Sequence, residues 1–185
     1  MIGYAFCGSF CTLSASLNFL RKLALQDDII PIVSDVVYST DTRFWRSEDF
    51  LSEVKKITGK EPIHTIKDAE PLGPSVRLDS LVIAPCTGNT LAKLACGITD
   101  TPVTMAAKAH LRSDRPLLIA LASNDALSAN LKNIATMLQK KNVYLTVMRQ
   151  DDPNKKPHSL VWDAESIELC YEKMKLGIQV HPLFI

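Results

Sequence analysis

The segment at residues 84–102, APCTGNTLAKLACGITDTP, gathers a thiol, two hydroxyls, a carboxamide and a glycine within five positions. These groups stand between an apolar run and an amphipathic one, and they belong to Cys86, Thr87, Gly88, Asn89 and Thr90. One capping side chain is enough to begin a helix, so the additional hydrogen-bonding groups indicate a ligand. Hydroxyl and amide donors beside a glycine suit an anion such as a phosphate.

Similar residues follow the other apolar runs that read as strands. In an open parallel sheet, ligands bind outside the carboxyl ends of the strands, where helix N-termini present unpaired N–H groups to anions. We therefore predict a phosphate cradle that needs no lysine, and the alternative is that each residue only caps its own helix. The predicted cradle comprises Gly8, Ser9, Ser34, Thr87, Asn89, Thr90, Ser123 and Asn124.

The two best-known phosphate-binding fingerprints are missing from the sequence. It contains neither G-x-G-x-x-G nor G-x-x-x-x-G-K-[ST], which disfavours a dinucleotide or triphosphate site of those types. A ligand with a single phosphate, such as FMN, suits the inventory better.

Short apolar runs alternating with amphipathic segments predict the framework that positions these residues. Continuous apolar runs are typical of parallel strands that are covered on both faces. We predict an α/β fold with a three-layer, doubly wound parallel sheet of Rossmann-like type, in one domain spanning residues 1–185. The predicted strands are 1–7, 29–33, 81–84, 116–121 and 143–147; the main helices are 10–24, 47–58, 89–96, 102–111, 125–139 and 163–175; and loops are expected at 34–46, 62–77 and 148–158.

The composition excludes several classes of function. A net charge of +1 over 185 residues gives no electrostatic signature of nucleic-acid or anionic-membrane binding. The five cysteines have no zinc spacing, so we expect no metal and reduced thiols in a cytoplasmic protein. No charged residue precedes Arg21, whereas a signal peptide needs positive charge before its apolar region, and we expect a soluble protein.

The segment at 84–102 resembles the Pro-x-Ser/Thr-x-Asn-Thr-x-x-Lys-x-x-x-Gly-x-x-Asp motif of the flavin-dependent cysteine decarboxylases. The chain is more similar still to one branch of that superfamily, the B subunits of dipicolinate synthase. The resemblance covers nearly the whole chain and rests on GSFCT at 8–12, STDTRF at 39–44, ITGKEPIHTIKDAEPLGP at 57–74, DTPVTMAAKAHLR at 100–112, SNDAL at 123–127 and QDDPNKKPHSLV at 150–161.

This resemblance implies an FMN protein that is homo-oligomeric and has a doubly wound fold. Gly8 and Ser9 would meet the flavin phosphate, with Ser34 as a second contact. The segment from Thr87 to Thr90 would line the ribityl chain or the ring edge. Ser123 and Asn124 lie where the decarboxylases have an Ala-Met-Asn turn.

The branch implies an oxidoreductase subunit that helps to make dipicolinate in the mother-cell cytoplasm of a spore former. Its substrate would be dihydrodipicolinate or the hydroxylated precursor. Its partner would be an A subunit that resembles a nicotinamide dehydrogenase and would bind NAD(P). A pocket for such a dianion needs cations or oriented N–H groups, and the candidate cations are Arg43, Lys108, Arg112 and His158.

The sequence departs from the decarboxylases where they carry a catalytic histidine. The corresponding region reads EPLGP, and the nearest histidine, His64, has a different context, so no catalytic residue is assigned. Three functions stay open: an oxidoreductase subunit with a working FMN, a non-catalytic flavin-fold partner of the A subunit, and an FMN-dependent decarboxylase of a cysteinyl substrate.

Overall fold

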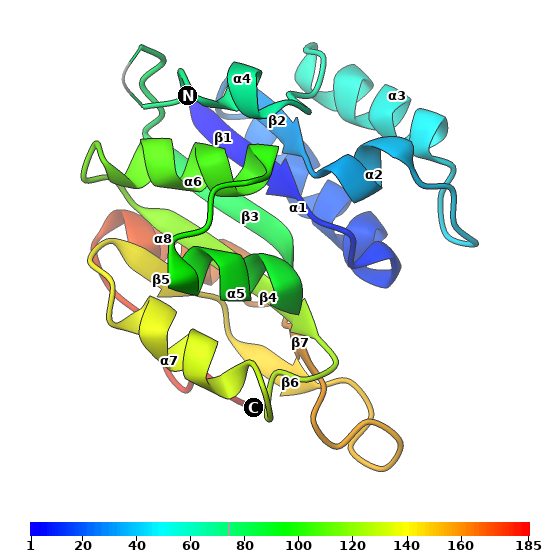
Figure 1. Cartoon of the computed structure of the whole chain (residues 1–185), viewed down its shortest axis with the longest axis vertical. Coiled ribbons are helices and arrows are strands. Elements are labelled where there is room, and N and C mark those ends of the chain that lie inside the picture. The colour runs from blue at the N-terminus through cyan, green and yellow to red at the C-terminus, as the bar shows by residue number, and fades with distance from the viewer. Residues whose placement is uncertain (74) are drawn as a thin grey trace.

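The computed structural model describes residues 1–73 and 75–185, and its central feature is a sheet with helices on both faces (Figure 1). Pro74, which ends the motif at 57–74 and belongs to the predicted loop 62–77, lies outside the described residues. In the described part of the chain, no helix combines the length and the apolar character that crossing a membrane requires.

Seven strands form the sheet, in the order β2-β1-β3-β4-β7-β6, with β5 also paired to β4. They are β1 (Ile2–Phe6), β2 (Ile29–Val33), β3 (Ser80–Thr87), β4 (Leu117–Ser123), β5 (Val143–Leu145), β6 (Met148–Gln150) and β7 (Leu160–Trp162). All five predicted strands are present, and strands β1 to β5 pair in parallel, as predicted.

The helices connect the strands and cover both faces of the sheet. They are the short 3₁₀ helix η1 (Phe10–Thr12), α1 (Leu13–Ala24), α2 (Asp35–Ser39), α3 (Ser47–Thr58), α4 (Ile66–Ala69), α5 (Gly88–Cys96), α6 (Pro102–Leu111), α7 (Leu131–Leu138) and α8 (Ile167–Lys175).

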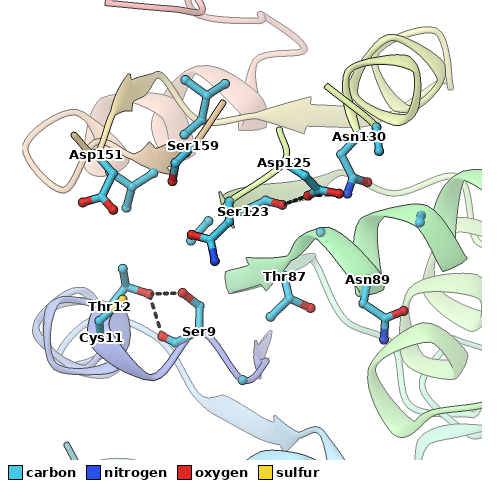
Figure 2. A pocket seen from close by; sticks show the side chains of 18 of the residues that line it. Ser9, Cys11, Thr12, Thr87, Asn89, Ser123, Asp125, Asn130, Asp151 and Ser159 are labelled. Atoms are coloured by element: carbon cyan, nitrogen blue, oxygen red, sulfur yellow. Dashed lines mark hydrogen bonds between the residues drawn. The ribbon is translucent and has the colours of Figure 1, made fainter. Parts of the chain in front are cut away.

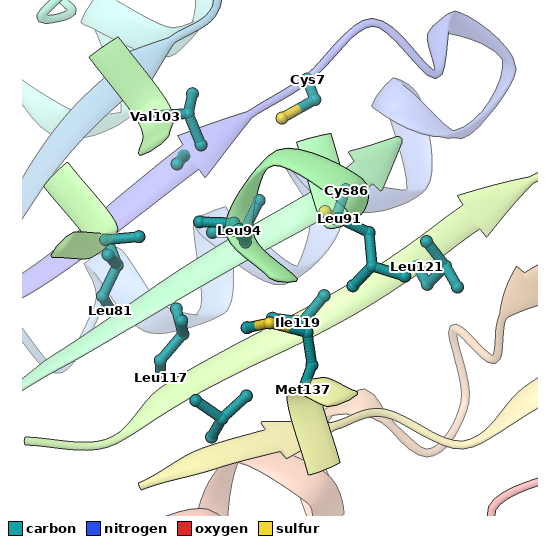
Figure 3. Packing of buried hydrophobic residues seen from close by; sticks show 14 of the residues in the cluster. Cys7, Leu81, Cys86, Leu91, Leu94, Val103, Leu117, Ile119, Leu121 and Met137 are labelled. Atoms are coloured by element: carbon teal, nitrogen blue, oxygen red, sulfur yellow. The ribbon is translucent and has the colours of Figure 1, made fainter. Parts of the chain in front are cut away.

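The alternation of side chains along β1 divides the core into two layers. Ile2, Tyr4 and Phe6 point toward α1, α3 and α8, whereas Ala5 and Cys7 point toward the opposite face. That opposite face is covered by α5, α6 and α7, which lie in front of the sheet in Figure 1. Figure 3 shows the leucines and isoleucines of β3 and β4 packed beneath these helices.

Helix boundaries follow the capping signals in the sequence. Thr101 forms a capping box with Thr104, and Pro102 occupies the first turn of α6. Gly59 and Gly97 end α3 and α5 in the left-handed conformation that glycine adopts without strain.

The sheet is not wholly parallel, which corrects one part of the predicted fold. β7 runs antiparallel to β4, and β6 runs antiparallel to β7. The predicted loop at 148–158 therefore begins with a strand, and the connection to β7 is a hairpin. Three-residue strands have too little alternation to be recognised in a polar, proline-bearing segment.

Three predicted boundaries were also wrong. The predicted helix at 125–139 begins only at Leu131, because residues 124–130 form turns held by the Asp125 carboxylate. The predicted loop at 34–46 contains the short helix α2, capped by Ser34. The predicted helix at 163–175 begins at Ile167, since the Asp163 carboxylate accepts a hydrogen bond from the Ser166 N–H.

Candidate functional site

A cavity of about 960 Å³ lies at the carboxyl ends of β1, β3 and β4, the edge where the sequence predicted a cradle. We call it the carboxyl-end cavity. It is lined by residues 8–12, 87–89, 122–125 and 159–161, with Phe44, Ala92, Ala129, Asn130, Lys132, Asn133 and Asp151. Figure 2 shows side chains from these separate strand ends around one common space.

The first wall is the turn between β1 and α1. The Ser9 N–H donates to the Cys7 carbonyl at 2.8 Å, which reverses the chain directly after the strand. The Thr12 hydroxyl lies 2.9 Å from the Ser9 carbonyl and 3.2 Å from its hydroxyl oxygen, so two hydroxyls stand side by side before α1 (Figure 2). The start of a helix beside two hydroxyls is a suitable place for an anion.

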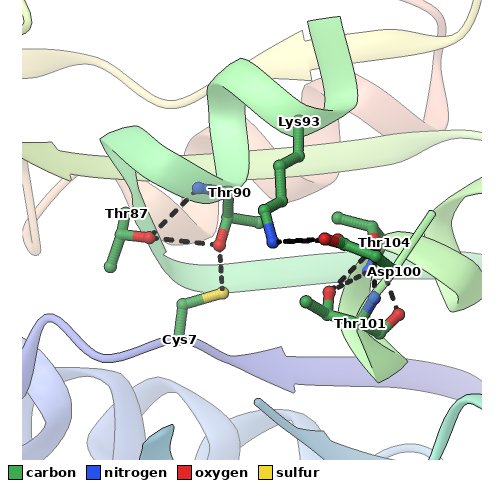
Figure 4. A network of polar contacts seen from close by, with 7 residues as sticks. All are labelled: Cys7, Thr87, Thr90, Lys93, Asp100, Thr101 and Thr104. Atoms are coloured by element: carbon green, nitrogen blue, oxygen red, sulfur yellow. Dashed lines mark hydrogen bonds and ion pairs between the residues drawn. The ribbon is translucent and has the colours of Figure 1, made fainter. Parts of the chain in front are cut away.

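The second wall is the beginning of α5. The Thr87 hydroxyl accepts from the Thr90 N–H at 3.2 Å and donates to the Thr90 hydroxyl at 3.1 Å. Thr90 in turn donates to the Cys7 sulfur at 3.4 Å, which joins this wall to the end of β1 (Figure 4). Thr90 is therefore buried between the two walls, while Thr87 and Asn89 line the cavity.

Gly88 is the point where the second and third walls touch. A β-carbon at this position would lie 2.3 Å from the Ser123 hydroxyl oxygen and 2.7 Å from the Asn130 amide nitrogen. Non-bonded atoms cannot approach so closely, so any side chain here would displace the side chains of Ser123 and Asn130. The glycine in the motif is thus required by packing at the floor of the cavity.

The third wall is the turn after β4, organised by Asp125. Its carboxylate accepts from the Ser123 hydroxyl at 2.5 Å and from the Asn130 amide at 2.8 Å. These hydrogen bonds hold the pKa of Asp125 below the usual aspartate range, so the group is ionised at neutral pH. Asn133 donates to Asn130 at 2.8 Å and supports the same turn.

The fourth wall comes from the hairpin between β6 and β7. Asp151 and Ser159 line the cavity there, and Asp151 pairs with Lys156, whose pKa it raises. The Leu127 N–H donates to the His158 carbonyl at 2.9 Å, which ties the hairpin to the turn after β4. The carboxyl-end cavity therefore contains one carboxylate already balanced by a neighbouring ammonium.

Six of the eight predicted cofactor residues line this cavity: Gly8, Ser9, Thr87, Asn89, Ser123 and Asn124. The other two, Ser34 and Thr90, do not line the cavity. Ser34 caps α2 by accepting from the Val37 N–H at 3.5 Å, and Thr90 lies behind Thr87. Asp125 and Asn130 were not predicted as site residues, because both fell inside a predicted helix. The signal for Asp125 is a Ser-Asn-Asp turn sequence directly after a strand.

The predicted substrate cations do not gather at this cavity. Arg43 lies over the Phe44 ring, with its guanidinium carbon 4.8 Å from the ring centroid. Phe44 lines the cavity, whereas Arg43 is not among the lining residues. His158 precedes the lining residue Ser159 in the sequence and does not itself line the cavity. Lys108 and Arg112 line a different cavity of about 340 Å³, because α6 packs on the face of the sheet and not at its carboxyl end.

Two buried thiols lie directly behind the first two walls. Cys7 and Cys86 are at most 1% exposed. Hydrogen bonds from Cys86 and Thr90 lower the pKa of Cys7, whereas burial raises the pKa of Cys86. Both side chains pack in the core, as expected for Cys86. His64 stacks on Tyr38 with ring centroids 3.9 Å apart, and the residues that line the carboxyl-end cavity do not include it.

The chain is similar to known flavoproteins over most of its length. The flavoprotein family model matches residues 10–167. The B subunit of dipicolinate synthase from Bacillus subtilis (strain 168) is 39% identical over all 185 residues, which cover 92% of that relative. The crystal structure of the corresponding B subunit from Bacillus halodurans superimposes with a TM-score of 0.89 at 37% identity, covering 100% of this chain and 95% of that one.

A more distant structure shares the fold. The FMN-dependent cysteine decarboxylase SpaF superimposes with a TM-score of 0.68 at 20% identity, over 95% of each chain. Taken with the family match and the full-length similarity to two B subunits, these findings show that the chain belongs to the flavoprotein family and is a relative of the dipicolinate synthase B subunits.

Proposed function

We propose that this protein binds FMN in the carboxyl-end cavity and is the B subunit of a dipicolinate synthase. It would help to convert dihydrodipicolinate, or its hydroxylated precursor, to dipicolinate during sporulation, in the mother-cell cytoplasm. The observation that carries the proposal is the convergence of Ser9, Thr87 and Ser123 on one cavity, in a chain similar over its full length to a B subunit.

The donor set of the cavity fits FMN. Ser9 and Thr12 at the start of α1 would hold the phosphate, because their hydroxyls add to the partial positive charge of the helix N-terminus. The ionised Asp125 carboxylate would accept hydrogen bonds from the ribityl hydroxyls, and the Asn89 amide would donate to them. A volume of about 960 Å³ is at the upper end of ordinary ligand sites, which suits a cofactor of this size.

Conversion of a dihydropyridine diacid to the aromatic diacid removes a hydride and a proton. Bound FMN would supply the hydride acceptor, and the protein would orient the substrate beside it. Arg43 and His158, which adjoin the lining residues Phe44 and Ser159 in the sequence, are the side chains we propose for the substrate carboxylates. The A subunit, with NAD(P), is the proposed partner, and the protein itself is proposed to be a homo-oligomer.

One observation favours a second candidate function, a non-catalytic flavin-fold partner of the A subunit. The residues that line the carboxyl-end cavity in the described chain include no histidine, and their only cation is Lys132. A site that oxidises a dianion by itself would need more positive charge and a base. In this second function the nicotinamide on the A subunit would accept the hydride, and the protein described here would contribute stability or substrate capture.

Anaerobic absorbance spectroscopy separates the candidates. Protein loaded with FMN is mixed with dihydrodipicolinate, first alone and then with the A subunit. Bleaching of the oxidised flavin bands without the A subunit supports the oxidoreductase. A protein that takes up no FMN, yet is needed for turnover by the A subunit, supports the partner function. Release of carbon dioxide from a cysteinyl substrate would instead indicate a decarboxylase.

A further inference from the structure

A second cavity, of about 340 Å³, lies where α5, α6 and α7 meet on one face of the sheet (Figure 1). We call it the α6 cavity. It shares no lining residue with the carboxyl-end cavity, and its size is within the range of small-molecule sites. The proposed flavin chemistry makes no use of it.

The floor of the α6 cavity is apolar. Leu94 and Met137 are 8% and 1% exposed, and the partly buried Leu111 packs against the same core. Ile98 stands exposed at the rim. Such a surface favours a flat apolar group, because burying a ring against it removes apolar area from water.

The rim of the α6 cavity is cationic. Lys108 in the last turn of α6 and Arg112, the residue that caps its C-terminus, are exposed and four residues apart, so they share one face of the helix. Two positive charges at this spacing repel each other, and an anion between them would remove the repulsion. The guanidinium of Arg112 offers a planar pair of donors that matches a carboxylate.

A third cation is held in place at the same cavity. The Lys140 ammonium donates to the Leu94 carbonyl at 3.0 Å, which ties the end of α7 to the last turn of α5. An ammonium has three donors, so this contact leaves two for a ligand. The half-buried Lys140 is therefore already positioned, and little conformational entropy is lost when an anion arrives.

Negative charge does not offset these cations within the cavity. The ten residues that line it include no aspartate or glutamate in the described part of the chain. Asp100, next to the lining residue Thr99, is paired with Lys93 at 2.8 Å (Figure 4). The carboxyl-end cavity differs in this respect, since it is lined by Asp125 and Asp151.

We propose that the α6 cavity is a binding site for a small aromatic carboxylate, with the ring on the apolar floor and its carboxylates between Lys108, Arg112 and Lys140. The ligand class rests on the cavity alone. Only the choice of pyridine-2,6-dicarboxylate as a probe rests on the proposed function, because this compound is the product of the proposed reaction. Its binding here would be product binding at a site separate from the flavin.

Isothermal titration calorimetry of the full chain, in metal-free buffer, tests the proposal with two probes of the same shape. Pyridine-2,6-dicarboxylate and benzene-1,3-dicarboxylate should each bind wild type with a dissociation constant below about 1 mM. Arg112→Gln and Lys108→Gln should each weaken binding about tenfold or more, and Arg112→Lys should restore part of it. Lys56→Gln, which removes an exposed lysine from α3, should change nothing.

Probes that separate charge from shape complete the experiment. Benzene-1,3-dicarboxamide keeps the ring without the charge, and inorganic sulfate keeps the charge without the ring; both should bind at least about tenfold more weakly. Equal affinity in wild type and both α6 variants would overturn the proposal, as would no binding up to about 10 mM. Binding lost in Gly88→Ala but kept in Arg112→Gln would place the ligand in the carboxyl-end cavity and also overturn it.

The outcome is independent of the proposed function. A protein that binds no FMN, or that shows no turnover, could still bind benzene-1,3-dicarboxylate through Lys108 and Arg112, and that result would support the α6 site while removing the flavin proposal.

Discussion

Gly88, the first residue of α5, lies against the Ser123 hydroxyl at the end of β4, where a β-carbon would come within 2.3 Å of the oxygen. The contact joins the motif at 84–102 to the turn held by Asp125. It explains in packing terms why a glycine stands among hydrogen-bonding residues, and it makes the floor of the carboxyl-end cavity sensitive to a single methyl group.

Substitution Gly88→Ala should therefore both destabilise the fold and weaken FMN binding. Overpacking at such a contact costs about 1–3 kcal/mol of unfolding free energy, and we expect FMN affinity to fall about tenfold or more. Urea unfolding and a flavin fluorescence titration measure the two effects.

The matched control is Gly59→Ala, at a left-handed glycine with no atom within 4 Å of the added β-carbon. It should cost about 1 kcal/mol through backbone strain and leave FMN affinity unchanged. An equal loss of FMN affinity in both variants would show that the effect comes from general instability and not from the contact with Ser123.

The Thr90 hydroxyl links Thr87 to Cys7, and its removal should loosen the two walls that it joins. Thr90→Val keeps the shape of the side chain and removes both hydrogen bonds, so we expect a loss of about 1–2 kcal/mol. Thr136→Val, on the exposed face of α7, should stay within about 0.5 kcal/mol of wild type. Similar unfolding free energies for the two variants would contradict the role given to the Thr90 hydroxyl.

The cysteines provide a chemical test of the cavity. Cys11 and Cys96 are exposed, whereas Cys7, Cys86 and Cys170 are buried, so a thiol reagent should label two sites quickly and three slowly. Cys11 lines the carboxyl-end cavity, and Cys96 does not. Saturating FMN should slow the labelling of Cys11 and leave Cys96 unaffected, as peptide mass spectrometry would show. Equal protection of both thiols, or of neither, would argue against FMN in this cavity.

His110 should make the fold sensitive to mild acid. Its side chain is fully buried, its Nε2 lies 2.9 Å from the Pro116 carbonyl, and its Nδ1 has no partner among the described residues. Burial lowers the pKa of His110 in the folded protein, so the unfolded chain binds a proton more readily. Stability should therefore fall as the pH drops below the ordinary histidine value of about 6.5.

Unfolding free energies measured between pH 7.5 and about pH 5 check this expectation. His110→Gln should be less stable than wild type at the upper end of that range and should show a shallower dependence on pH. His181→Gln, at an exposed position, should keep the wild-type slope. If the unfolding free energy of His110→Gln depends on pH as steeply as that of wild type, His110 is not the cause of the acid sensitivity.

The elements that the sequence predicted correctly are those that a short local pattern of residues determines. The apolar runs of β1 to β5 are long enough to be recognised, and Thr101, Pro102 and Gly97 mark helix ends through capping rules that need no tertiary context. Because parallel strands end at one edge, the convergence of Gly8, Thr87 and Ser123 followed from topology.

The predictions failed for elements whose structure depends on contacts that form only in the folded chain. Asp125 replaces the first turns of a predicted helix with a hydrogen-bonded turn, which depends on Asn130 folding back toward it. Lys108 and Arg112 were correctly placed on one helix, yet the direction in which that helix faces is set by packing against the sheet. The short strand β7 depends on pairing with β4, and β6 depends in turn on pairing with β7.

The most direct test of the account compares the binding of FMN and of riboflavin, which lacks the phosphate, to wild type and to a Ser9→Ala, Thr12→Ala double variant. Wild type should bind FMN once per chain and at least about tenfold more tightly than riboflavin, and the double variant should lose most of this preference. Equal affinity of wild type for the two flavins, or no binding of either, would contradict the claim that the β1–α1 turn holds a phosphate.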